Sequence, residues 1–214
     1  MAKQTAGEEA QKETGRVEAF SDGVFGIAIT LLILEIKIPQ PAEVLGKMSL
    51  AVALARQWPA YISYLTSFLT ILIMWINHHR LFRHIRKTDD NFLLANGLLL
   101  MAVTIVPFPT AVLSLWSQTP DANMAAKLYT GSLVAIAVLF NVVWRYASGD
   151  SRLLTAGHDR KEVEAITRQY RFGPLLYLST FALSFVSVVA SIGMCMGLAI
   201  YFAIPSRKAV CVTD

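Results

Sequence analysis

The first apolar segment of the chain holds an ionisable residue where a membrane-spanning helix usually excludes one. The segment reads AFSDGVFGIAITLLILEIK over residues 19–37, and Asp22 lies near its beginning. An unpaired charge inside a bilayer costs at least about 2.5 kcal/mol, so an ionisable residue there needs partners and is a candidate functional residue. The simpler alternative is that Asp22, next to Ser21, only caps the start of the helix.

Hydrogen-bond donors for this carboxylate occur at the end of the second apolar segment, which reads WINHHRLFRHIRK over residues 75–87. Indole, amide, imidazole and guanidinium groups can all donate a hydrogen bond to a carboxylate. Arg16, less than two helical turns before Asp22, is another candidate. The candidate donors of the second segment are Trp75, Asn77, His78, His79 and Arg80.

The first segment also has an apolar stripe on a different face from Asp22. At about 100° per residue, Ile27, Leu31 and Leu34 fall on one helical face, with Thr30 beside them. Asp22 falls about 140° away from Ile27 and points toward neighbouring helices. Periodicity alone leaves open whether the stripe lines a pore, packs in a core or faces lipid.

The composition places these segments in a membrane. Of the 214 residues, 55% are hydrophobic and only 16% are charged, and the mean hydropathy is +0.50. A soluble domain carries about 25% charged residues, and a bilayer-spanning helix needs about 20 apolar residues. The apolar runs therefore predict an all-α membrane protein with six transmembrane helices. The predicted spans are about 17–38, 57–78, 92–116, 124–146, 172–186 and 188–204.

The last apolar run, residues 172–206, is longer than one upright span requires. We expect it to break into two short helices near Ser184, Ser187 or Ser191, where small residues cluster, with one long tilted helix as the alternative. The polar connection before it includes residues 160–170, which fit a short amphipathic helix at the cytoplasmic surface.

Four further residues inside the predicted spans are expected to have structural roles. Pro107 and Pro109 are expected to bend or end the third span, because neighbouring helices can satisfy the freed backbone groups. Asn96 and Asn141 are expected to form hydrogen bonds between helices.

The basic residues predict the orientation of the chain. Fifteen of the 19 lysines and arginines fall on one side of the six predicted spans, the side that holds both termini. Because basic loops stay in the cytoplasm, both termini are predicted to be cytoplasmic. The predicted organisation is a flexible N-terminal tail over 1–14, a six-helix transmembrane domain over 15–205 and a cytoplasmic tail over 206–214.

Three stretches of the chain resemble the transmembrane protein 175 family, the endo-lysosomal potassium channels and their bacterial relatives. They are RVEAFSDGVFGIAITLLILEI at residues 16–36, WINHHRLFRHI at 75–85 and VPFPTAVL at 106–113. The resemblance covers roughly residues 16–205. It implies a multi-pass potassium channel of the bacterial plasma membrane, a homotetramer in which four copies of the first helix line a central pore.

The resemblance also assigns the apolar stripe. It implies that Ile27 forms the narrowest ring of the pore, that Thr30 contributes potassium preference, and that Leu31 and Leu34 continue the wall. An apolar ring offers an ion no ligands and can close a pore by dewetting. The chain has no Thr-Val-Gly-Tyr-Gly filter, so moderate potassium selectivity is expected. Permeating potassium is the expected ion, and no cofactor or other metal is expected.

On the same resemblance, Asp22 and its neighbours anchor the first helix rather than bind ions. The motif residues would hold the first helix against the second through side chains of both. The residues of this predicted network are Arg16, Phe20, Ser21, Asp22, Trp75, Asn77 and His78.

Three other classes of function compete with a channel. A proton-coupled secondary transporter would use Asp22 and His78 as proton carriers, but the chain shows no internal inverted repeat. An enzyme is not expected: His78 and His79 point about 100° apart on a helix, and no metalloprotease motif is present. A scaffold that conducts no ions is the third alternative.

Overall fold

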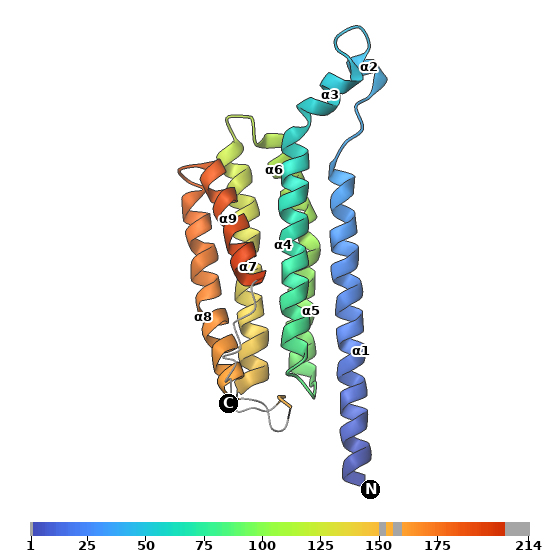
Figure 1. The fold of residues 1–214 in the computed structure, drawn as a ribbon, viewed down its shortest axis with the longest axis vertical. Coiled ribbons are helices and arrows are strands. Elements are labelled where there is room, and N and C mark those ends of the chain that lie inside the picture. The colour runs from blue at the N-terminus through green and yellow to red at the C-terminus, as the bar shows by residue number, and fades with distance from the viewer. Residues whose placement is uncertain (1, 150–152, 156–159, 204–214) are drawn as a thin grey trace, which may run out of the picture.

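The computed structural model describes residues 2–149, 153–155 and 160–203, and every regular element within them is a helix (Figure 1). The predicted all-α fold is confirmed. The predicted tail 206–214 lies outside the described residues. The elements are α1 Ala2–Leu31, a 3-10 turn Leu32–Glu35, α2 Pro41–Val44, α3 Leu50–Arg56, α4 Trp58–Phe82, α5 Asp90–Ile105, α6 Pro107–Trp116, α7 Ala122–Ser148, α8 Arg160–Leu183 and α9 Val188–Ala203.

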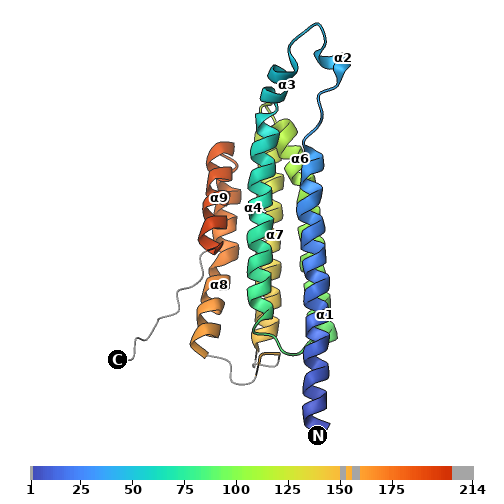
Figure 2. The ribbon, with the colours of Figure 1, turned by 45° about the vertical axis from the view of Figure 1, so that its right-hand side comes forward.

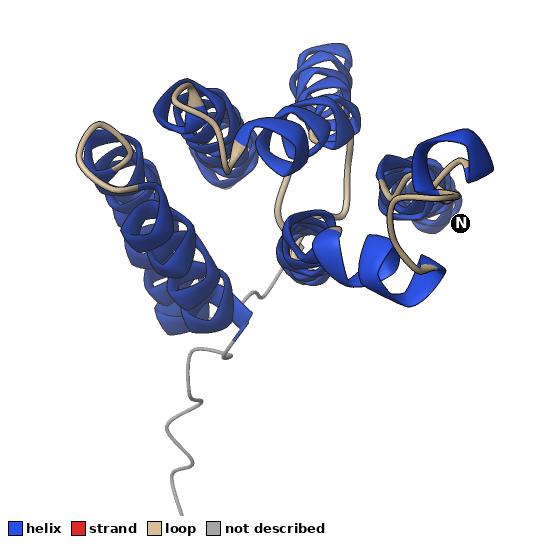
Figure 3. Ribbon diagram, turned by 90° about the horizontal axis from the view of Figure 1, so that it is seen from above, coloured by secondary structure: helices blue, strands red, loops and turns tan. Residues whose placement is uncertain are grey.

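The long helices form a bundle with α1 at one edge and α8 and α9 at the other (Figures 1 and 2). The edge helix α1 packs on α4 and α5, whereas α7 packs on α5, α6, α8 and α9. Seen from the end of the bundle, α1 stands apart from the α8–α9 pair, with α4 and α5 between them (Figure 3). One side of α1 is therefore left without a neighbour among the described helices.

Among the residues that the structure describes, four helical segments are long and apolar enough to cross a membrane: Glu9–Glu35, Trp58–Phe82, Asp90–Trp116 and Ala122–Ser148. They correspond to the first four predicted spans. The chain also has a shorter apolar helix, α9. The first half of α8, which begins RKEVEAITRQY, is polar and charged.

The third of these segments is bent at its proline, as the sequence predicts. Helix α5 ends at Ile105 and α6 begins at Pro107, which has no N–H to continue the ladder. The Thr110 hydroxyl donates to the Val106 carbonyl at 2.8 Å. It also lies 2.7 Å from the Ser67 hydroxyl of α4. These hydroxyls fix the bend between neighbouring helices.

The prediction of a separate amphipathic surface helix over 160–170 is wrong. Helix α8 runs without a break from Arg160 through Pro174 to Leu183. Proline removes the hydrogen bond to the carbonyl four residues earlier, which belongs to Tyr170. The Asn141 amide of α7 donates to this carbonyl at 2.6 Å, so the helix continues. Asn141 thus forms the interhelical hydrogen bond predicted for it.

The break predicted in the last apolar run is confirmed. Helix α8 ends at Leu183 and α9 begins at Val188, so a single tilted helix is excluded. In the turn between them, the Ser184 hydroxyl donates to the Phe181 carbonyl at 2.6 Å. The Ser187 hydroxyl accepts from the Ala190 amide at 3.3 Å. Of the three serines at which the break is predicted, Ser184 and Ser187 therefore bond backbone groups of the turn.

The first helix begins earlier than expected. Residues 2–14, predicted as a flexible tail, continue α1 toward the N-terminus. This stretch has no proline and is rich in alanine, glutamate, lysine and glutamine, which favour helix. Its last residue, Thr14, is buried and donates to the carbonyl of Arg86 at 3.0 Å. That contact joins the extension of α1 to the connection after α4.

Candidate functional site: the two faces of α1

Helix α1 buries one narrow stripe against the bundle. Ser21, Phe25, Ala28 and Leu32 follow each other at steps of four, three and four residues, and each is at most 1% exposed. This spacing puts them on one side of a helix, and α1 packs on α4 and α5. The buried stripe therefore fixes the rotation of α1 about its own axis.

The opposite face of α1 is apolar and uncovered. Ile27 is 59% exposed, Leu31 41% and Leu34 62%. Thr30 is also exposed, and its hydroxyl donates its hydrogen to the Ile27 carbonyl at 2.9 Å. The lone pairs of the Thr30 oxygen thus remain available on this face. The stripe deduced from periodicity is present, and it does not pack in the core of its own chain.

Asp22 lies beside the buried stripe and faces α4. The indole Nε1 of Trp75 donates to Asp22 Oδ1 at 2.8 Å. Asp22 lies well inside the long helix α1, which begins at Ala2, so it does not cap the N-terminus of that helix. The capping alternative is therefore wrong, and the structure brings together Asp22 and Trp75 as the sequence suggested.

A second contact lies one helical turn away from the first. Glu18 precedes Asp22 by four residues and His79 follows Trp75 by four, and their side chains meet at 2.8 Å between Oε1 and Nδ1. The rings of Trp75 and His79 stack with centroids 6.2 Å apart. His79 is among the donors that the sequence predicts, whereas Glu18 is not among the predicted residues. The four-residue spacing of the two pairs is the signal that could have found it.

A buried hydrogen-bonded chain joins α1, α5 and α4. Ser21 donates its hydrogen to the Val17 carbonyl at 2.8 Å, so its oxygen accepts from Asn96 Nδ2 at 3.0 Å. The Asn96 oxygen in turn accepts from His78 Nε2 at 3.0 Å. His78 Nε2 therefore carries a hydrogen. Asn96 forms the interhelical hydrogen bonds predicted for it and is the centre of this series of hydrogen bonds.

His78 is enclosed by aromatic rings. Its ring centroid lies 5.2 Å from that of Phe25, 4.5 Å from that of Phe82 and 6.5 Å from that of Phe140. The residue is fully buried, and within the described part of the chain its Nδ1 has no hydrogen-bond partner. His78 thus holds α4 in the core, and its hydrogen bond goes to Asn96 rather than to Asp22.

The structure does not bring the other three predicted network residues to Asp22. Arg16 and Phe20 are exposed and line a surface groove of about 460 Å³ between α1 and α5. Asn77 faces the opposite side of α4. Its backbone carbonyl accepts a hydrogen bond from the Tyr170 hydroxyl at 3.4 Å, and its side-chain Oδ1 accepts one from Arg80 at 3.4 Å. On a helix Asn77 lies about 200° from Trp75, which explains the difference.

Comparison with known proteins gives the family. A model of the family described as the endosomal/lysosomal potassium channel TMEM175 matches residues 16–107. A potassium channel of Chamaesiphon minutus is 56% identical over 197 residues, which cover 92% of this chain and 97% of the relative. The chain belongs to the TMEM175 family. TMEM175 proteins are channels, so the chain is a membrane protein of a channel family and not an enzyme.

Two further TMEM175 relatives cover almost the same part of the chain. A potassium channel of Streptomyces collinus is 40% identical over 203 residues, which cover 92% of this chain and 97% of the relative. The crystal structure of a lysosomal potassium-selective channel TMEM175 homologue from Chamaesiphon minutus superposes with a TM-score of 0.84 at 54% identity, and covers 92% of this chain and all of that one. The fold of this chain is thus that of a TMEM175 subunit.

Proposed function

We propose that this chain is a potassium-permeable cation channel that works as a homotetramer with α1 of each copy around a central pore. The observation that carries the proposal is the uncovered apolar face of α1, where Ile27 and Leu34 are 59% and 62% exposed while the opposite face is fully packed. The potassium channels that are 56% and 40% identical to this chain support potassium as the permeant ion.

In this proposal Ile27 forms the narrowest ring. Four isoleucine side chains offer an ion no oxygen ligand, so an ion must keep its water or shed part of it there, and the ring gates by dewetting. Potassium loses water more readily than sodium, which gives moderate selectivity. The Thr30 oxygens, with their hydrogens already donated to Ile27, add partial coordination. Leu31 and Leu34 extend the wall.

The contacts on the other side of α1 keep this face directed at the pore. Trp75 binds Asp22, and the chain of Ser21, Asn96 and His78 locks α1 to α5 and α4. A rotation of α1 breaks these hydrogen bonds before it moves Ile27 out of the ring. Phe20, Ser21 and Asp22 therefore position the helix and do not bind potassium.

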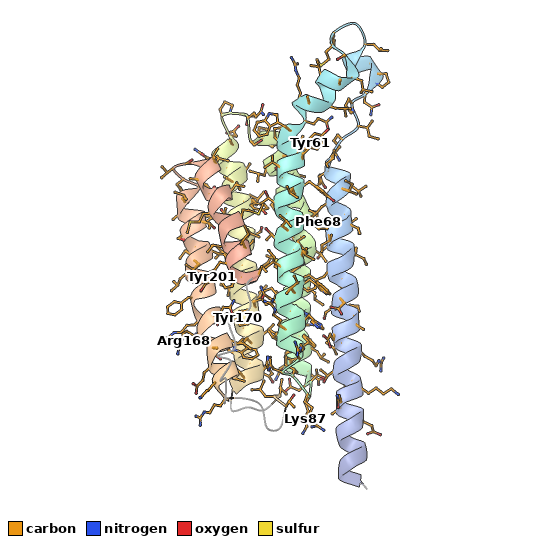
Figure 4. The ribbon with its side chains drawn as sticks, viewed as in Figure 1. Tyr61, Phe68, Lys87, Arg168, Tyr170 and Tyr201 are labelled. Carbon is orange, nitrogen blue, oxygen red and sulfur yellow. The ribbon has the colours of Figure 1, made fainter. Side chains whose placement is uncertain are left out.

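The proposed subunit crosses the bacterial plasma membrane six times with both termini in the cytoplasm. Helices α1, α4, α5 with α6, α7, α8 and α9 alternate in direction along the bundle (Figure 1). Lys87 and Arg168 lie toward the end that holds the start of α1, and Tyr61 lies at the other end (Figure 4). Because basic residues gather on the cytoplasmic side, the positions of Lys87 and Arg168 support this orientation.

A proton-coupled transporter has less support. The partner of Asp22 is an indole N–H, which does not titrate, and His78 is bonded to Asn96. The two titratable groups are thus hydrogen-bonded to different partners rather than to each other.

The reversal potential of the purified protein in a planar bilayer tests the proposal, with potassium chloride on one side and sodium chloride on the other. A sustained current that reverses toward the potassium equilibrium potential is expected. Absence of current, or a saturable flux that needs a proton gradient, contradicts it.

Ile27→Asn should then increase the current and reduce potassium preference, because it hydrates the ring. Leu175→Asn on α8 is the matched control, since Leu175 is 61% exposed at the other edge of the bundle.

A further inference from the structure

Lys37 stands at the end of the exposed face of α1. Helix α1 ends at Leu31, the 3-10 turn ends at Glu35, and the backbone of Ile36 is extended. From this extended segment the Lys37 side chain reaches back, and its Nζ donates to the Leu34 carbonyl at 3.0 Å. Leu34 itself is 62% exposed on the apolar stripe.

This hydrogen bond places a positive charge where a helix otherwise presents negative charge. The last carbonyls of a helix have no internal donor and carry the negative end of the helix dipole. An uncovered Leu34 carbonyl would attract a cation at the end of the stripe. Lys37 occupies that oxygen with one of its three hydrogens and leaves the rest of its ammonium group exposed.

We propose that Lys37 limits the entry of cations at the end of the pore opposite the N-terminus. This inference rests on the proposed function, because it needs four copies of α1 around one axis. Four ammonium groups then surround the mouth beyond Leu34. At 0.01 M salt, four unit charges at about 10 Å from an ion lower its local concentration by about sevenfold, and the effect shrinks as the Debye length falls from about 30 Å at 0.01 M salt to 3 Å at 1 M.

The neighbouring charges do not change the sign of this effect. Glu35 is the last residue of the 3-10 turn and is partly buried. Glu35 is unchanged when Lys37 is replaced, so the variant loses one positive charge per subunit, the mouth becomes more negative and the local concentration of cations rises. Lys47, which lies exposed between α2 and α3, carries the same charge in the connection beyond the helix end. It serves as the matched control.

Single-channel recordings of Lys37→Met test the inference, since each channel in a bilayer has one orientation and the two directions of current are measured separately. In 0.01 M potassium chloride the current that enters from the Lys37 end should increase at least about twofold. In 1 M salt the variant should match the wild type. Lys37→Arg, which keeps the charge and a donor, should retain the wild-type current, and Lys47→Met should change it much less.

Three results would overturn the inference: no change in Lys37→Met at low salt, an equal change in Lys47→Met, or an increase that persists in 1 M salt. The last result would indicate that loss of the hydrogen bond reshapes the helix end. Failure of the proposed function is separate, because it is seen as the absence of potassium current in the wild type. Elution of each variant at the wild-type volume in size-exclusion chromatography controls for folding.

Discussion

The Asn141 side chain donates a 2.6 Å hydrogen bond to the carbonyl of Tyr170, the acceptor that Pro174 leaves without a donor in its own helix. A buried carbonyl without a donor costs about 1–3 kcal/mol. The ring of Tyr170 also stacks on that of Phe140, with centroids 6.1 Å apart and planes 6° from parallel. Helix α7 thus supplies the hydrogen bond that allows α8 to pass through a proline.

Replacement of Asn141 by alanine should lower the free energy of unfolding by about 1–3 kcal/mol, because the Tyr170 carbonyl loses its donor. Thermal unfolding in detergent, followed by circular dichroism, measures the change. Asn123→Ala, at an exposed position of the same helix, should have little effect. Pro174→Ala restores a backbone donor, so Asn141→Ala should cost less in that background. An equal cost in both backgrounds would contradict the pairing.

Loss of the Asp22–Trp75 hydrogen bond should impair assembly or opening more than ion preference. Asp22→Ala and Trp75→Phe each remove one partner, and a hydrogen bond to a charged group contributes about 1.5–3 kcal/mol. The yield of tetramer in size-exclusion chromatography and the open probability in bilayers should fall in both variants. The double variant should lose little more than either single one, as expected for residues that interact.

The nearby Glu18–His79 pair is the control for this experiment. Its side chains are 26% and 50% exposed, so Glu18→Gln should change stability by no more than about 1 kcal/mol. Normal expression and tetramer yield of Asp22→Ala together with an altered potassium-to-sodium preference would refute the anchoring role.

Asn96→Leu should be the most damaging of these substitutions. It removes both the donor to Ser21 and the acceptor for His78. Ser21 keeps its hydrogen bond to the Val17 carbonyl, but the buried His78 Nε2–H is left without an acceptor. The unsatisfied group costs about 1–3 kcal/mol and the lost bond to Ser21 about 0.5–1.5 kcal/mol, so a loss of about 1.5–4.5 kcal/mol in unfolding free energy is expected. Folded yield in detergent and thermal unfolding measure it. Near-normal stability would show that the hydrogen bonds that link His78, Asn96 and Ser21 do not hold α1 in place.

Thr30→Val should reduce potassium preference while it leaves folding intact. Valine keeps the shape of threonine but removes the oxygen that faces the uncovered side of α1. The reversal potential under potassium and sodium gradients should move toward zero. Thr104→Val on α5 is the matched control, since the Thr104 hydroxyl is also exposed and also donates to a carbonyl three residues earlier. A similar shift in both variants would exclude a specific role for Thr30.

The sequence by itself determined the long apolar helices and the two faces of α1. A bilayer demands about 20 apolar residues per span, so the apolar runs predict the helices that cross it, and the 100° step of a helix separates Ile27 from Asp22 without any knowledge of the fold. The break near Ser184 and the bend at Pro107 also follow from local chemistry. These features depend on residues close together in the chain.

The tertiary structure decided which partner each polar side chain meets. Several donors lay within reach of Asp22 in the sequence, and the rotation of α4 selected Trp75 and turned Asn77 toward Tyr170. The continuity of α8 through Pro174 depends on Asn141 of another helix, and the start of α1 at Ala2 includes the contact of Thr14 with Arg86. A hydrogen bond between residues far apart in the chain depends on how two helices pack, and no local pattern of residues contains that information.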